Sequence, residues 1–160
     1  LASDLNGDIW VGTTSGVAIF ECGGSAFDPS CQGTLRVVEQ DGFGALLLES
    51  ESVTAIAVDG ANRKWVGTLN GVFLLSPTGE EQIARFTVEN SPLFDNQIVD
   101  IAVDPGNGEV FIGTASGLIS FQGDAVEGGL SHRSELLVYP NPVREDYDGP
   151  IAIKGLLKTF

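Results

Sequence analysis

The side chains of this chain that could carry out acid–base or nucleophilic chemistry are mostly members of a repeated pattern. Asp59 and Asp104 stand at one position of the pattern, and a threonine recurs further along at Thr13, Thr68 and Thr114. Equivalents that recur in every repeat mark architecture, whereas a reaction centre needs different groups that converge. We therefore interpret the aspartates as acceptors of hydrogen bonds from the turns that follow them, and the threonines as hydroxyls at strand ends.

The single histidine offers no better catalytic site. Ser131 and His132 are neighbours in a polar, glycine-containing stretch that has the composition of a linker. A nucleophile and a base need a rigid frame that holds them together, and a linker does not provide one. We predict no catalytic residue and expect that the chain is not an enzyme.

Two groups of residues resemble metal sites. The segment Asp4–Asp8 resembles the start of a calcium loop, but the twelfth position, where such a loop carries glutamate, is Ser15. Cys22 and Cys31 lie about a hundred residues from His132, which argues against a zinc site. We therefore expect a structural turn at the first group, and no metal or cofactor.

The two cysteines fit a disulfide. Cys22 and Cys31 lie in a stretch by which the first repeat exceeds the second by nine residues, and turn residues flank both of them. Two cysteines at the base of a surface loop indicate a disulfide, and a disulfide implies export from the cytoplasm. A pair of unlinked thiols is the alternative.

The repeat itself determines the expected architecture. The phrase at Trp10–Thr13 returns at Trp65–Thr68 and at Phe111–Thr114, and each copy is followed after two residues by glycine. The spacing between copies matches the blade of a β-propeller, which has about 40 to 50 residues and four strands. The residues that define the repeat are Trp10, Gly12, Thr13, Gly16, Asp59, Trp65, Gly67, Thr68, Gly71, Asp104, Phe111, Gly113, Thr114 and Gly117.

The second repeat predicts four strands, at residues 53–59, 64–68, 72–76 and 82–87, with turn residues between them. The first of these strands is apolar on both faces, which is typical of a strand buried between two neighbouring sheets. An apolar stripe with the period of a helix is not visible. We predict an all-β chain.

The chain divides into three parts in this interpretation. Residues 1–122 form the C-terminal blades of a propeller, about two and a half four-stranded antiparallel blades. Residues 123–135 are a linker, and residues 136–160 begin a small β-sandwich that is cut short. Because a propeller closes only with about four to eight blades, we expect a piece of a larger molecule.

Charge excludes one class of partner. The chain has 8 Lys and Arg against 22 Asp and Glu, a formal net charge of −14. Such a surface repels phosphate backbones, so nucleic acid is not an expected partner. Apolar stretches of about 20 residues, as needed to span a bilayer, are also absent from the sequence.

The motifs carry a family resemblance. The phrase Asp-x-x-(Gly/Asn)-x-x-Trp-Val-Gly-Thr-x-x-Gly-Val, over residues 4 to about 121, resembles the two-component-regulator type of propeller repeat. The run Tyr139-Pro140-Asn141-Pro142 resembles the opening of the C-terminal sorting domain of the type IX secretion system of Bacteroidetes. The two together are similar to the propeller-bearing surface component of that system's attachment complex.

The resemblance implies an exported, non-catalytic, outer-membrane-associated component at the cell surface. Its partners would be other proteins of the attachment complex, and it would assist the delivery of anionic lipopolysaccharide for anchoring secreted cargo. Because the net charge of −14 opposes binding of an anionic polysaccharide, we expect any such binding to involve regions outside this chain.

Two other functions are compatible with the same repeat. The first is an extracytoplasmic polysaccharide-sensing propeller of a hybrid two-component system, which would continue into a membrane helix. The second is a fragment of a secreted propeller enzyme, because a sorting signal is an address and says nothing of cargo chemistry. The motif Tyr139–Pro142 favours the secretion component over the sensor.

Overall fold

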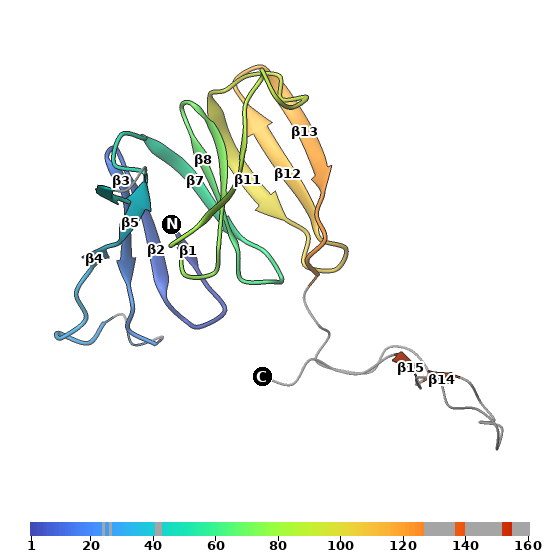
Figure 1. Ribbon diagram of the computed structural model, residues 1–160, viewed down its shortest axis with the longest axis horizontal. Coiled ribbons are helices and arrows are strands. Elements are labelled where there is room, and N and C mark those ends of the chain that lie inside the picture. The colour runs from blue at the N-terminus through green and yellow to red at the C-terminus, as the bar shows by residue number, and fades with distance from the viewer. Residues whose placement is uncertain (24, 26, 41–42, 127–136, 140–151, 155–160) are drawn as a thin grey trace. The chain divides into compact units, whose positions relative to one another are not determined.

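The structure is a computed structural model that describes residues 1–23, 25, 27–40, 43–126, 137–139 and 152–154. All regular elements in these residues are β-strands, as predicted (Figure 1). The chain divides into two compact units, Leu1–Glu127 and Gly128–Phe160.

In the part of the chain that the structure describes, the first unit contains three antiparallel sheets of three or four strands and a separate two-stranded hairpin. The first sheet has the order β1 (Ala2–Ser3), β2 (Ile9–Thr13), β3 (Gly16–Phe20) and β4 (Thr34–Leu35), so both of its outer strands have two residues. Strands that follow one another in sequence are neighbours in the sheet, which is the connectivity of a propeller blade.

The second sheet is the most regular. It consists of β7 (Val53–Val58), β8 (Lys64–Thr68), β9 (Gly71–Leu75) and β10 (Gln82–Phe86), within one residue of the predicted strand ends. A β-bulge interrupts the pairing of β7 with β8 and another that of β10 with β9. The predicted four-stranded blade is confirmed.

The third sheet has three strands in the part of the chain that the structure describes. They are β11 (Ile98–Val103), β12 (Glu109–Thr114) and β13 (Gly117–Gln122). In β12, buried residues alternate with half-buried ones along the whole strand, so this sheet is covered on one face. Its other face includes Val99 and Leu118, which are 60% and 66% exposed.

A hairpin between the first and second sheets was not predicted. Strand β5 (Val37–Gln40) pairs with β6 (Phe43–Leu46). The sequence signal that predicts such a hairpin is the Asp41-Gly42 pair, because Asp-Gly between two strands favours a tight two-residue turn.

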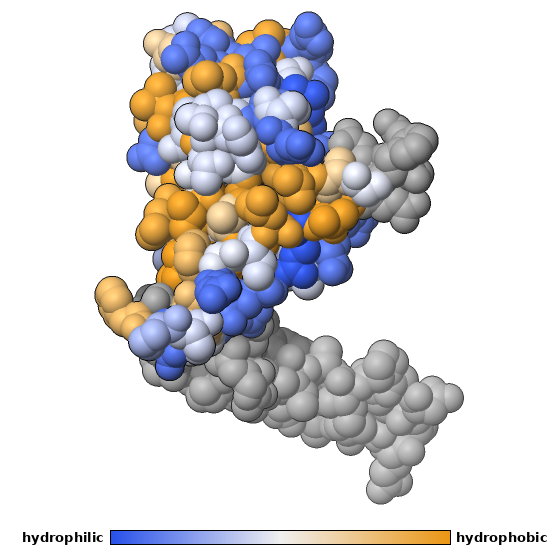
Figure 2. Space-filling view, turned by 90° about the vertical axis from the view of Figure 1, so that its left-hand side faces the viewer, coloured by the Kyte–Doolittle hydropathy of each residue, from blue (hydrophilic) through white to orange (hydrophobic). Residues whose placement is uncertain are grey.

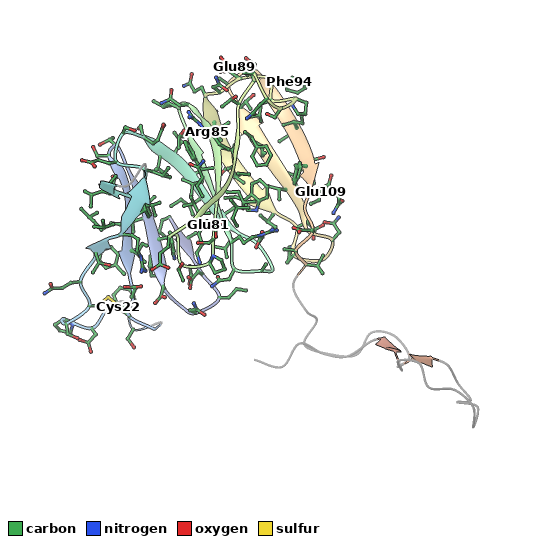
Figure 3. The ribbon with its side chains drawn as sticks, in the orientation of Figure 1. Cys22, Glu81, Arg85, Glu89, Phe94 and Glu109 are labelled. Atoms are coloured by element: carbon green, nitrogen blue, oxygen red, sulfur yellow. A yellow bond between two sulfur atoms is a disulfide. The ribbon has the colours of Figure 1, made fainter. Side chains whose placement is uncertain are left out.

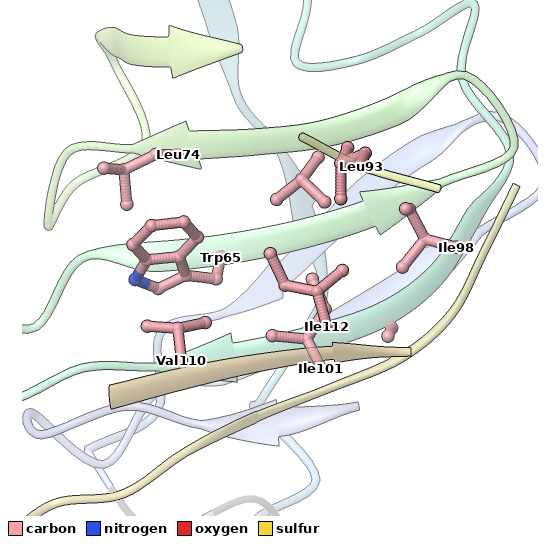
Figure 4. Packing of buried hydrophobic residues seen from close by; sticks show 9 residues of the cluster. Trp65, Leu74, Leu93, Ile98, Ile101, Val110 and Ile112 are labelled. Carbon is pink, nitrogen blue, oxygen red and sulfur yellow. The ribbon is translucent and has the colours of Figure 1, made fainter. Parts of the chain in front are cut away.

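The sheets stack face to face, and two apolar clusters fill the spaces between them. One cluster contains Trp10 and Ile56, from the first and second sheets. The other contains Ala55, Trp65 and Val110, from the second and third sheets (Figure 4). Neighbouring residues of β7 thus enter opposite clusters, which confirms that this strand is buried on both faces.

The side of the unit that carries the first sheet shows a band of apolar side chains (Figure 2). Half-buried pairs, Ile9 with Phe20 and Val11 with Ala18, face each other across β2 and β3. The two end sheets of the stack therefore each have one incompletely covered apolar face.

At two of its three positions, the repeated glycine of the Trp-Val-Gly-Thr phrase stands where the next sheet leaves no room for a Cβ atom. A Cβ at Gly67 would lie 2.6 Å from Cγ2 of Ile98, on the first strand of the next sheet, and a Cβ at Gly12 would collide with Val53 in the same way. At the matching Gly113 a Cβ would fit without a clash, since the nearest atom to it would be the carbonyl oxygen of Asp100 at 3.6 Å.

In the second unit, β14 (Leu137–Tyr139) pairs antiparallel with β15 (Ala152–Lys154). The predicted linker residues 127–135 and the motif residues 140–142 lie outside the described residues.

The close approach at Gly67 predicts different effects for one substitution at two equivalent positions. In the 160-residue chain, Gly67→Ala should lower the free energy of unfolding by about 1–3 kcal/mol, because the added methyl group overpacks the contact with Ile98. Gly113→Ala is the matched control and should leave it unchanged or raise it by about 0.5–1 kcal/mol. Urea denaturation measures both, and equal effects at the two positions would contradict the stacking of the sheets.

Candidate functional site

The recurring threonines and glycines form one turn that is built three times. The hydroxyls of Thr13, Thr68 and Thr114 donate to the carbonyl of the glycine three residues later, at 3.0, 3.0 and 2.8 Å. Each hydroxyl oxygen also accepts a hydrogen bond from the backbone N–H two residues later. These hydroxyls are thus occupied by the turn.

The recurring aspartates cap the turns at the opposite ends of the strands. Oδ1 of Asp59 accepts from the backbone N–H groups of Ala61 and Arg63, both at 3.0 Å. Oδ2 accepts from Nε of Arg63 at 2.7 Å and from the indole N–H of Trp65 at 3.2 Å. Four donors occupy this buried carboxylate, so it does not offer the free oxygen of a general base.

The other two aspartates repeat this arrangement in part. Asp4 accepts from the backbone N–H groups of Asn6 and Asp8 and from the indole of Trp10. Asp104 accepts from the backbone N–H of Gly106, and the indole bond has no counterpart there because the third repeat carries phenylalanine.

A buried lysine that sequence analysis did not select joins the first sheet to the second. Lys64 is fully buried. Its Nζ donates to Oδ2 of Asp4 at 2.9 Å and to the carbonyls of Asn62 at 2.9 Å and Pro77 at 2.6 Å. It also lies 4.6 Å from the ring centroid of Trp10. All three ammonium protons have acceptors, so the buried charge is satisfied.

Burial and hydrogen bonding act in opposite directions on this pair. Burial lowers the pKa of Lys64, and the contact with Asp4 opposes this effect without cancelling it. Burial raises the pKa of Asp4, but hydrogen bonds from Lys64 and from the amides of Asp8 and Asn6 outweigh it, so the pKa lies below its ordinary value. The folded protein therefore favours an ionised carboxylate at this position.

A second cation links the second sheet to the segment after β13. Arg63 donates to Asp59 and, through Nη2, to Asp124 at 2.5 Å. The amide of Gly123 donates to the carbonyl of Gly108 at 3.0 Å. The chain leaving the third sheet is thus attached to the turns at one end of the stack.

A hollow of about 660 Å³ lies between the β5–β6 hairpin region and strands β9 and β10 of the second sheet. Leu46, Leu48 and Phe73 give it apolar walls. The Arg85 guanidinium lies 4.9 Å from the Phe73 ring centroid (Figure 3). The polar side chains on its lining are Glu49, Ser50, Glu51, Glu80, Gln82 and Arg85.

Two of the polar side chains that line the hollow form hydrogen bonds with Asn70. Oε2 of Glu51 accepts from Nδ2 of Asn70 at 2.9 Å, and Arg85 donates to the carbonyl of Asn70 at 3.3 Å. The described residues that line the hollow include no histidine or cysteine.

Cys22 and Cys31 form a disulfide, with Cα atoms 5.6 Å apart (Figure 3). Among the described residues, no group of three His, Cys, Asp or Glu side chains is placed to hold a metal ion. Ser131 and His132 lie outside the described residues. The part of the chain that the structure describes also contains no helix long and apolar enough to cross a membrane.

Comparison with known proteins gives matches among solved structures. No family model matches the chain, and no curated protein does. One similar structure is PorZ, described as an essential bacterial surface component of the type IX secretion system of Porphyromonas gingivalis. The match has a TM-score of 0.72 and 37% identity over 98% of this chain, which confirms the resemblance predicted from the motifs. This chain spans 21% of the length of that one.

A second similar structure is the extracellular domain of the putative hybrid two-component system BT3049 of B. thetaiotaomicron. It has a TM-score of 0.58 and 24% identity over 79% of this chain and 16% of its own. At this identity the match supports the fold alone.

The buried ion pair predicts a large loss of stability when one partner is removed. Asp4→Ala should lower the free energy of unfolding by about 3–5 kcal/mol, because it leaves the Lys64 charge buried without its counterion. The double variant Asp4→Ala/Lys64→Met should lose less free energy of unfolding than Asp4→Ala alone, because it also removes the buried charge. Urea denaturation of the parent chain, the two single variants and the double variant measures the coupling between Asp4 and Lys64. Losses of free energy that simply add would contradict a stabilising ion pair.

The lowered pKa of Asp4 predicts a dependence of stability on pH. Unfolded aspartate titrates near about 3.9. The contribution of Asp4 is therefore fully present above that pH and is lost as the pH falls through the lower folded pKa. Between about pH 5 and pH 2, the free energy of unfolding should fall less steeply in Asp4→Asn than in the parent chain. If the plots of the free energy of unfolding against pH were parallel for the two proteins, Asp4 would not be ionised in a stabilising contact.

Proposed function

We propose that this chain is part of a non-catalytic cell-surface component of the type IX secretion attachment complex. The observation that carries the proposal is the match to PorZ, at 37% identity over 98% of the chain with a TM-score of 0.72. The run Tyr139-Pro140-Asn141-Pro142, which resembles the opening of a sorting domain of the same system, is consistent with the proposal.

The proposed organisation assigns residues 1–122 to the terminal blades of a propeller, 123–135 to a linker and 136–160 to the start of the sorting domain. The division into Leu1–Glu127 and Gly128–Phe160 and the antiparallel pair β14–β15 are consistent with this assignment.

A structural role for the repeated polar residues supports a function without catalysis. The Thr68 hydroxyl and the Asp59 carboxylate are committed to turns, and the latter has four donors. Binding of other proteins would then depend on exposed loops and strand edges. The disulfide Cys22–Cys31 fits a protein exported to an oxidising environment.

The proposed role in the complex is to help deliver anionic lipopolysaccharide to secreted cargo. The net charge of −14 makes this chain a poor binder of that polysaccharide, so contact with it would come from other parts of the protein. The contribution of this chain would be to hold partner proteins of the complex.

A polysaccharide-sensing domain of a hybrid two-component system is the second candidate. The match to the extracellular domain of BT3049, with a TM-score of 0.58, is consistent with this candidate through the shared fold.

Deletion of the gene in the bacterium that makes the protein distinguishes these functions. If the protein belongs to the secretion complex, cargo with sorting domains should remain in the periplasm and lack attached lipopolysaccharide, while total lipopolysaccharide is unchanged. Immunoblots of cell fractions measure both, and protease treatment of intact cells tests surface exposure. The deletion strain carrying the full-length gene is the control, and it should restore secretion. Normal secretion with a lost transcriptional response to a polysaccharide would contradict the proposal in favour of the sensor.

A further inference from the structure

The connection between β3 and β4 is an insertion into the first repeat. It runs over residues 21–33, whereas the corresponding connection between β9 and β10 in the second repeat runs over residues 76–81. The cysteines of the disulfide lie within the longer connection, at positions 22 and 31. The packing of the sheets does not require this loop, because the second sheet is complete without one.

The loop has its own internal order. Backbone hydrogen bonds of 2.9 Å run from Ser25 to Cys22, from Asp28 to Ser25 and from Cys31 to Asp28, donor first. Oδ1 of Asp28 accepts from the N–H of Ser30 at 2.8 Å and from its hydroxyl at 2.6 Å. These hydrogen bonds and the disulfide connect the described residues Cys22, Ser25, Asp28, Ser30 and Cys31 before any partner binds. Restriction of this kind lowers the entropy lost on association.

Phe27 is the one large side chain inside this loop, and it is fully exposed, with a relative accessibility of 102%. Burial of a phenylalanine side chain is worth about 1.5–3 kcal/mol, so its exposure leaves that free energy available for binding. Aromatic anchors that enter a partner's pocket are frequent among the residues that dominate binding energy at interfaces.

The charges around Phe27 restrict the kind of partner. Between Cys22 and Cys31 there is no lysine or arginine, and Asp28 follows Phe27 directly. The hydrogen bonds from Ser30 lower the pKa of Asp28, so this carboxylate is ionised at neutral pH. An anionic membrane surface would repel the loop, whereas basic residues of a protein would attract it.

We propose that the Cys22–Cys31 loop docks onto a partner protein, with Phe27 inserted into an apolar pocket that has basic residues at its rim. The loop supplies the rigid support, Phe27 the buried contact and Asp28 the charge contact. This surface is separate from the hollow beneath the hairpin, and its assignment does not depend on the secretion role.

A photoreactive amino acid at position 27 tests the proposal. The full-length protein would carry p-benzoylphenylalanine in place of Phe27, in the bacterium that makes it. The matched control places the same group at Leu35, which is 56% exposed on β4 of the same sheet. Position 27 should give one discrete cross-linked protein, mapped by mass spectrometry to an apolar pocket with Lys or Arg at its rim, and position 35 should not. Cross-links that match those of position 35, or that join two copies of the chain or a lipid, would overturn it.

Binding of that purified partner to the full-length protein provides the second measurement. Phe27→Ala should raise the Kd at least about tenfold, whereas Leu35→Ala should change it by less than about twofold. Cys22→Ser/Cys31→Ser should raise it about threefold to tenfold, because the loop must then be ordered on binding. Equal urea midpoints of the parent and the two alanine variants would show that these substitutions leave the fold intact. An unchanged Kd for Phe27→Ala would overturn the proposal.

Discussion

The close packing of one sheet on the next is the constraint on which the rest of the structure depends. The middle sheet packs one face against Trp10 and the other against Val110, so its strands β8 and β9 are buried on both faces. At Gly12 and Gly67 the first strand of the following sheet leaves no room for a side chain. The Trp-Val-Gly-Thr phrase thus combines a large residue that fills the gap between sheets with a small one that permits the contact.

This constraint explains why the recurring polar residues are unsuited to chemistry. Turns at both ends of tightly packed strands need their backbone groups satisfied, and Asp59 and Thr68 supply that. Where a charge falls between two sheets, at Lys64, it is fully partnered by Asp4 and two carbonyls. Function is therefore left to surfaces that the packing does not control, such as the Cys22–Cys31 loop and the hollow beneath the hairpin.

The sequence predicts those parts of the structure that depend on short, repeated residue patterns. The strands of the second sheet were predicted to within one residue, because turn residues separate runs of apolar residues that recur in the other repeats. The role of Lys64 was not predictable in this way. Its counterparts in the other repeats are Ile9 and Val110, and its partner Asp4 lies sixty residues earlier in the chain. A contact between two sheets leaves no local pattern.

The β5–β6 hairpin and the Cys22–Cys31 loop lie outside the repeat, and the sequence indicates them in different ways. The β5–β6 hairpin has the Asp41-Gly42 signal but no counterpart between the second and third sheets, so comparison of repeats does not reveal it. The cysteine spacing left a disulfide and free thiols as alternatives, because sequence does not give the distance between the two residues.

The burial of the middle sheet on both faces is tested most directly by amide hydrogen exchange in the 160-residue chain. The account predicts the slowest exchange in β8 and β9, whose residues are all buried, and much faster exchange in β13, which is largely exposed. Uniform exchange across the three sheets, or exchange in β8 as fast as in β13, would contradict the stacking on which the account rests.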